Sequence, residues 1–208
     1  MRSVVKTAKT VEEAIREGLR ELGADKDDVT TEILEEPSKG IFGFIGTKEA
    51  KVKITVVNDP VKIAKSFIDE LLNKMDIEGT SMVKKEGSIL HVEITDIVSS
   101  DTGIVIGRRG NTIDAIQYLL SLVVNKDREN YIKTIVDVKG YRERREETLI
   151  RLANKMARKA KSSNRPVKLE PMNPYERRII HSALQDEENI KTYSEGKEPY
   201  RKIVIELR

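Results

Sequence analysis

The chain has 208 residues, of which 35% are charged and 4% aromatic, and its net charge is +3. It contains no cysteine, which excludes disulfides, thiolate nucleophiles and cysteine metal sites. No apolar run approaches the roughly 20 residues that a membrane helix needs, and the N-terminus lacks the apolar core of a signal peptide. We therefore expect a soluble, cytoplasmic protein without a transmembrane segment.

The positive charge is concentrated in the last third of the chain. Residues 140–208 hold 17 Lys and Arg against 11 Asp and Glu, whereas the residues before them are slightly acidic. A clustered surplus of this kind favours a polyanionic partner, and the alternative is a surface charged only for solubility.

The first segment, residues 1–57, is predicted to fold as strand, helix, strand, strand. Ser3–Lys6 alternates as a short strand, and Thr10 opens a capping box ahead of an amphipathic helix. Two further strands are expected at Val29–Glu35 and Lys48–Val57.

The turn between these last two strands is unusually apolar. It reads PSKGIFGFIG, with glycines spaced three apart and with Phe42 and Phe44 between them. This spacing is neither a phosphate loop nor a dinucleotide fingerprint. Either the two phenylalanines pack into the core of this small domain, or they form an exposed contact for a partner or a second copy of the chain.

The second segment, residues 58–139, is predicted in the order helix, strand, strand, helix, helix, strand. Asn58-Asp59-Pro60 marks its start, because it combines a turn, a cap and a first-turn proline. The predicted elements are a helix at Val61–Met75, strands at Ser81–Lys85 and Ile89–Thr95, a short helix or turn leading to Ile104–Ile106, a helix at Asn111–Val124 and a strand at Tyr131–Val138.

A glycine-bounded pair of arginines lies between the last two of these helices. Gly107 and Gly110 permit a tight turn and the close approach of another backbone. Arg108 and Arg109 supply forked donors that match phosphate geometry, and the helix that starts near Asn111, with that residue placed to cap it, directs its free amides to the same point. The turn therefore favours binding to a phosphate backbone, and the alternative is a helix connection whose arginines are merely solvated.

Apolar residues on both sides of this turn predict a groove for bases. Its candidate walls are Ile104, Ile106 and Ile113. The stretch V-I-G-R-R-G resembles the loop of KH domains, which clamps about four nucleotides, and the order of the elements is similar to the type II arrangement of that fold. The scarcity of aromatic residues fits a KH groove better than a fold that stacks bases on an aromatic sheet.

The third segment, residues 140–208, begins with a long helix predicted at Tyr141–Lys161. Extended residues at 166–172, a helix from Pro174 to about Asp186, and strands at Ile190–Tyr193 and Arg201–Leu207 follow it. A basic stripe falls within an arc of roughly 60° nearly opposite the apolar side of the long helix, and it consists of Arg144, Arg151, Lys155 and Arg158.

Arg177 and His181 lie four residues apart and therefore share a face of the Pro174 helix. A single histidine at the edge of an apolar face is more typical of packing, but the arginine one turn away and the surrounding positive charge favour phosphate contact. The pair, with Y-S-E-G at 193–196 and with Arg201, resembles the Arg-x-x-x-His (R-three-H) domain. That resemblance implies binding to single-stranded nucleic acid.

The three segments together resemble the Jag family of bacteria, whose members are also called SpoIIIJ-associated proteins, KhpB or EloR. The resemblance covers nearly the whole chain and implies an α+β fold of three small domains. These are a βαββ N-terminal domain at 1–57, a type II KH domain of order αββααβ at 58–139, and an R-three-H domain with helices on a small sheet at 140–208. Many relatives carry a long linker after the first domain, whereas here Val57–Pro60 is nearly the whole connection.

The family resemblance also implies a function. We expect a non-catalytic RNA-binding protein and RNA chaperone, with no cofactor and no metal, linked to cell elongation, division, cell shape or cell-wall organisation. Its expected partners are single-stranded RNA or single-stranded DNA, a small single-KH protein called KhpA, and a second copy of the chain. The alternative is an adaptor for an insertase or for the division machinery, acting mainly through the N-terminal domain.

Overall fold

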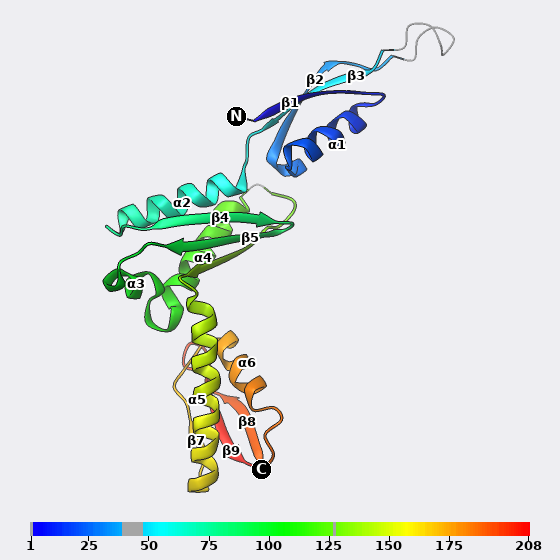
Figure 1. Cartoon of the computed structure of the whole chain (residues 1–208). Coiled ribbons are helices and arrows are strands. Elements are labelled where there is room, and N and C mark those ends of the chain that lie inside the picture. The colour runs from blue at the N-terminus through cyan, green and yellow to red at the C-terminus, as the bar shows by residue number, and fades with distance from the viewer. Residues whose placement is uncertain (1, 39–47, 127) are drawn as a thin grey trace. The chain divides into compact units, whose positions relative to one another are not determined.

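The computed structural model describes residues 2–38, 48–126 and 128–208, and the chain forms two compact units, 1–139 and 140–208. The fold is α+β, as predicted, and the described residues form three sheets of three strands each (Figure 1). None of the helices in these ranges is long and apolar enough to cross a bilayer. Phe42 and Phe44 lie outside the described residues.

The first sheet belongs to the βαββ segment and has the strand order β1-β3-β2, with antiparallel pairing throughout. Thr10 caps the helix that follows the first strand: its side chain accepts a hydrogen bond from the backbone amide of Glu13 at 3.2 Å, which is one half of the predicted capping box. A short 3₁₀ turn at Lys26–Asp28 precedes the second strand. The elements are β1 (Ser3–Ala8), α1 (Val11–Leu22), β2 (Val29–Glu35) and β3 (Ala50–Val56).

The second sheet has the order β4-β5-β6, in which β4 and β5 form an antiparallel hairpin and β5 and β6 are parallel. A parallel pair needs a crossover connection, and here two helices provide it, so the Gly107–Gly110 turn is held between them. The elements are α2 (Pro60–Lys74), β4 (Thr80–Glu86), β5 (Ile89–Thr95), α3 (Ser99–Ile106), α4 (Asn111–Val124) and β6 (Lys133–Val138).

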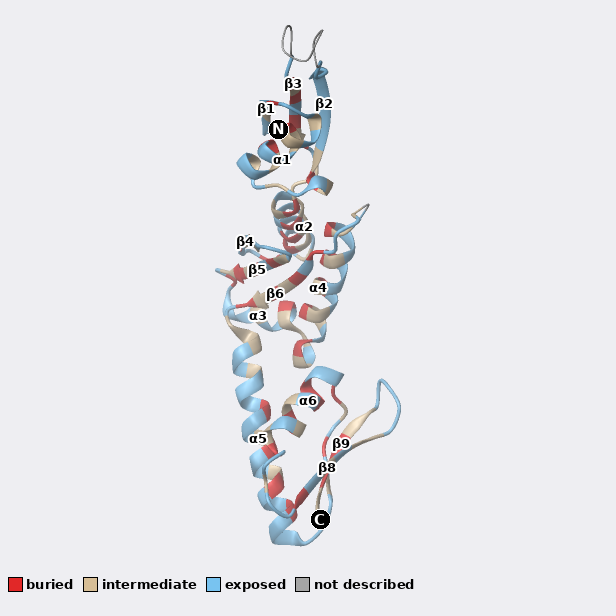
Figure 2. Ribbon diagram, turned by 90° about the vertical axis from the view of Figure 1, so that its right-hand side faces the viewer, coloured by how far each residue is buried: buried red, intermediate tan, exposed pale blue. Residues whose placement is uncertain are grey.

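The C-terminal unit packs two helices against a sheet of order β7-β9-β8. Buried residues of the long helix α5 form a stripe on the side that faces α6 and the strands, and its other sides are exposed (Figure 2). Helix α6 ends at Ala183, a few residues before the predicted end near Asp186. The elements are α5 (Tyr141–Ser163), β7 (Val167–Lys168), α6 (Pro174–Ala183), β8 (Ile190–Glu195) and β9 (Lys202–Leu207).

A buried ion pair joins residues of the first and second segments. One amino group of Arg128 binds the carboxylate of Asp28 and also donates to the carbonyl oxygen of Asn58 at 3.1 Å. The two charged side chains are only 1% and 3% exposed. Arg128 also donates from Nε to the carbonyl oxygen of Val124 at 2.9 Å, at the C-terminal end of α4. A buried charge without its partner is strongly destabilising. Because the same guanidinium also binds the carbonyl oxygen of Asn58, the pair holds the short connection between the two segments.

Replacing Asp28 with asparagine should lower the free energy of unfolding of residues 1–139 by about 3–5 kcal/mol, because it leaves the buried guanidinium of Arg128 without a carboxylate. The control is Arg2→Ala, which removes an ion pair of 3.2 Å to Asp59 in which the arginine is 54% exposed. This control should cost less than about 1 kcal/mol. Urea denaturation followed by circular dichroism measures both, and equal losses would contradict the prediction.

Candidate nucleic-acid interface

The Gly107–Gly110 turn uses backbone conformations that favour glycine. Gly107 has φ 74° and ψ 178°, a region that almost only glycine adopts, and Gly110 has φ 82°. Space is a second constraint, because a Cβ at Gly107 would lie 2.1 Å from Oγ1 of Thr112. Gly110 rather than Asn111 is the N-cap of α4, so the expectation that Asn111 caps this helix was wrong.

The turn presents its two arginines differently. Arg108 is exposed, whereas Arg109 is partly buried and has a left-handed backbone, with φ 58° and ψ 29°. A non-glycine residue in this conformation costs on the order of 1 kcal/mol. The backbone amide of Gly110 donates to the carbonyl oxygen of Gly107 at 3.3 Å and closes the turn that holds Arg109 there.

Helix α4 begins directly at this turn. The first amides of an α-helix have no partner within the helix, and they carry a partial positive charge. The 14 residues of α4 therefore add amide donors and a favourable dipole at the corner where Arg108 is exposed. A phosphate group fits the combined positive charge and donor geometry of this corner.

The three isoleucines that were predicted to line a groove do not all reach the surface. Ile104 is 56% exposed on α3 and Ile106 is partly exposed, but Ile113 is completely buried. Ile113 lies on the inward side of α4 together with Ile116 and Leu120, which are also buried. The prediction for Ile113 was therefore wrong, since this residue belongs to the core and cannot contact a base.

Arg177 is buried, contrary to the expectation that it faces phosphate. It is 8% exposed, and its Nε donates to the carbonyl oxygen of Met172 at 3.2 Å. Its two amino groups donate to Oγ of Ser194, at 3.4 Å, and to the carboxylate of Glu198. Arg177 therefore holds α6 against β8 and the loop that follows β8.

His181 belongs to the same polar cluster. Its Nδ1 lies 2.7 Å from Oγ1 of Thr192, and its Nε2 lies 3.2 Å from Oγ of Ser194. Burial lowers the pKa of His181 below its ordinary value, and the guanidinium of Arg177 lowers it further. Arg201 donates to the carbonyl oxygen of Gly196 at 3.2 Å and so fixes the loop between β8 and β9.

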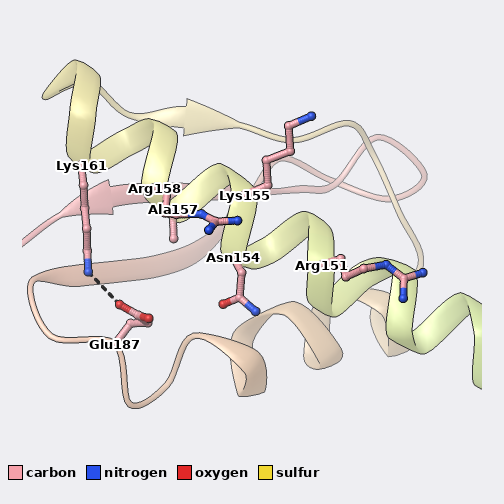
Figure 3. A pocket seen from close by; sticks show the side chains of 7 residues that line it. All are labelled: Arg151, Asn154, Lys155, Ala157, Arg158, Lys161 and Glu187. Carbon is pink, nitrogen blue, oxygen red and sulfur yellow. Dashed lines mark hydrogen bonds and ion pairs between the residues drawn. The ribbon is translucent and has the colours of Figure 1, made fainter.

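The basic stripe lies on exposed sides of α5, and part of it lines a groove of about 640 Å³ (Figure 3). Arg151, Lys155 and Arg158, three residues of the predicted stripe, line this groove. Arg144 is exposed but lies about 10 Å earlier along the helix, outside the groove. The other lining residues are Asn154, Ala157, Lys161 and Glu187.

Sequence reasoning missed two charged residues of this groove. Lys161 follows Arg158 by three residues, so helical spacing alone could have added it to the stripe. Glu187 comes from the loop after α6 and accepts a hydrogen bond from Nζ of Lys161 at 2.7 Å. A contact between residues so far apart in the chain left no signal in the sequence.

Replacing Gly107 with alanine should destabilise the protein by about 2 kcal/mol or more, because alanine is strained at this φ and ψ and its Cβ meets Thr112. Gly103 provides the matched control. It lies in α3, and an added Cβ there would meet nothing within 4 Å. Gly103→Ala should be neutral or stabilising by up to about 1 kcal/mol. Thermal denaturation distinguishes the two variants. An unchanged melting temperature in the Gly107→Ala variant would refute the claim that this turn requires glycine.

The C-terminal unit should lose stability in acid because of His181. Folding lowers the pKa of this histidine, so the unfolded chain takes up a proton at a higher pH than the folded chain does. The contribution of His181 to the stability of the folded unit is therefore full at pH values above its ordinary pKa of 6.5, and it decreases as the pH drops below that value. Between about pH 8 and about pH 5.5, the melting temperature of the His181→Gln variant should fall less than that of the unchanged protein. Identical pH profiles would contradict this assignment.

The chain matches three family models, which follow one another along the sequence. The Jag N-terminus model covers residues 6–56, the model for the KH domain of KhpA and KhpB covers residues 61–135, and the R-three-H domain model covers residues 147–207. These matches agree with the three sheets and with the fold expected from the sequence.

Two relatives align along nearly their whole length. The chain is 43% identical to the RNA-binding protein KhpB of Clostridium symbiosum over 208 residues, which cover 100% of this chain and 93% of that protein. It is 35% identical to the RNA-binding protein KhpB of Bacillus subtilis (strain 168) over 207 residues, which cover 99% of this chain and 98% of that protein. With its Jag N-terminal, KH and R-three-H domains in this order, the chain belongs to the KhpB family.

Proposed function

We propose that this chain is a non-catalytic RNA-binding protein that grips the backbone of single-stranded RNA at the Gly107–Gly110 turn. The observation that carries the proposal is the conformation of Gly107, which brings an exposed Arg108 and the first amides of α4 to one corner. Two relatives that align over nearly their full length are named RNA-binding proteins, and the matched KH model includes this turn.

Each part of the turn has a separate role in this binding. The glycines leave room for a sugar–phosphate strand to approach the protein backbone. Arg108 offers a forked guanidinium to phosphate oxygens, and the start of α4 adds amide donors. Ile104 and Ile106 on α3 supply the apolar surface beside the turn on which a base can rest.

The C-terminal unit adds phosphate contacts through the basic stripe on α5. Arg177, His181 and Arg201 act as positioning residues there, because their polar groups bind other parts of the unit. Two surfaces directed at phosphate suit binding to RNAs of many sequences, because phosphate contacts carry no sequence information. We further propose that the chain acts in the cytoplasm as an RNA chaperone, with the link to elongation, division and the envelope that the family resemblance implied.

Changing both Arg108 and Arg109 to aspartate should weaken binding to single-stranded RNA by at least about tenfold, because it replaces phosphate-binding cations with anions. The slope of log affinity against log salt should become shallower by about 0.7 for each phosphate that the variant no longer neutralises. The matched control changes Lys62 and Lys74, two exposed cations of α2, to aspartate. Fluorescence anisotropy measures both, and RNA binding by the Arg108/Arg109 variant equal to that of the control would refute the clamp.

A protein partner is a second proposed ligand, and it fits α4. Helix α4 exposes four apolar side chains outside its buried face, which are those of Tyr118, Leu119, Leu122 and Val123. Adjacent exposed apolar residues of this kind are typical of interaction surfaces. Because the matched KH model describes KhpA and KhpB together, we propose a single-KH protein of the KhpA type as the partner.

Leu122→Glu should abolish this association by placing a charge in an apolar interface. The control is Met82→Glu on β4, which also puts a glutamate in place of an exposed apolar residue. Analytical ultracentrifugation of the chain mixed with purified KhpA measures the complex. Persistent association with Leu122→Glu, or self-association of the chain through this helix without KhpA, would overturn the choice of partner.

A further inference from the structure

The groove on α5 has a regular row of polar side chains along one rim. Arg151, Asn154, Arg158 and Lys161 recur every three or four residues and therefore lie along one side of the helix, over about 15 Å. All four residues are exposed. The opposite rim is the loop after α6, from which Glu187 extends toward Lys161 (Figure 3).

The lining of the groove favours phosphate over bases. Its seven residues include four cations and one amide but no aromatic side chain on which a base could stack. A row of cations along a single helix suits successive phosphates of one strand, and the amide of Asn154 can donate to a phosphate oxygen or to a ribose hydroxyl. The groove is therefore suited to the backbone of single-stranded RNA, independently of its sequence.

Glu187 already provides an anion at one end of this row. Its carboxylate binds Nζ of Lys161 at 2.7 Å, and the two side chains are 43% and 41% exposed. An exposed ion pair of this kind contributes little to stability, so a stronger anion can displace it. An RNA phosphate that reaches Lys161 must compete with Glu187 and also meets its repulsion.

We propose that the α5 groove is the phosphate-binding site of the C-terminal unit, and that Glu187 sets its affinity by competing with RNA for Lys161. This inference rests on the proposed RNA-binding function and deepens it. It moves the contact from the Arg177 and His181 pair, which serves the interior of the unit, to an exposed groove on α5. It also assigns Glu187 the role of an internal competitor that weakens binding.

The test uses the full chain and a fluorescent single-stranded RNA of about 12 nucleotides. Glu187→Gln should strengthen binding by about three- to tenfold, because it removes a negative charge next to the phosphate. The matched control is Glu188→Gln, which removes the same charge from the neighbouring exposed residue outside the groove, and it should change affinity by less than about twofold. Changing Arg151 and Arg158 to glutamine should weaken binding by about tenfold and make the salt slope shallower by about 1.4.

The signs of these effects separate the inference from its alternatives. If the Lys161–Glu187 pair only braced the fold, Glu187→Gln would weaken binding or leave it unchanged, and the role of Glu187 as a competitor would be overturned. Unchanged affinity in the Arg151/Arg158 variant, while the Arg108/Arg109 variant still loses binding, would overturn the groove and leave the proposed RNA clamp at Gly107–Gly110 intact. A chain that binds no RNA at all would overturn both.

Discussion

The proposed RNA clamp depends on the backbone conformation of Gly107. A positive φ combined with an extended ψ turns the chain from α3 into α4 within four residues, and Thr112 occupies the space that a side chain would need. Because of this constraint, one arginine is held exposed next to the start of a helix, and another is held in a left-handed conformation. In the proposed clamp, the donors are therefore oriented before RNA binds, which lowers the entropy cost of binding.

Helix α4 is fixed at both of its ends. Its start is defined by the glycine turn, and its last turn receives a hydrogen bond from Arg128, whose charge is paired with Asp28. This arrangement gives the N-terminal segment a part in holding the helix that carries the proposed clamp. The short connection at residues 57–60 is consistent with such a fixed junction, whereas a long flexible linker would separate the two segments.

The C-terminal unit separates structural polar residues from the residues that are proposed to bind RNA. Arg177 and His181 form hydrogen bonds with Ser194, Thr192 and Glu198. Their pattern in the sequence therefore identifies residues that hold α6 to β8 and to the loop after it. The exposed cations of α5 keep their charges near solvent and form the groove. In the proposed scheme, Glu187 moderates the attraction of these cations for polyanions, since an unmoderated basic groove would hold RNA more tightly.

Much of the fold followed from the sequence, because helical and alternating periodicity, capping residues and glycine turns are local properties. They predicted the order of the elements, the limits of β2 and α4, the Gly107–Gly110 turn and the basic face of α5. The tertiary structure decided which residues at the edges of these patterns face inward. It buried Ile113 and Arg177, and it brought Glu187 to Lys161 across a separation of 26 residues. Such outcomes depend on how helices pack against sheets, and a pattern within one element does not contain that information.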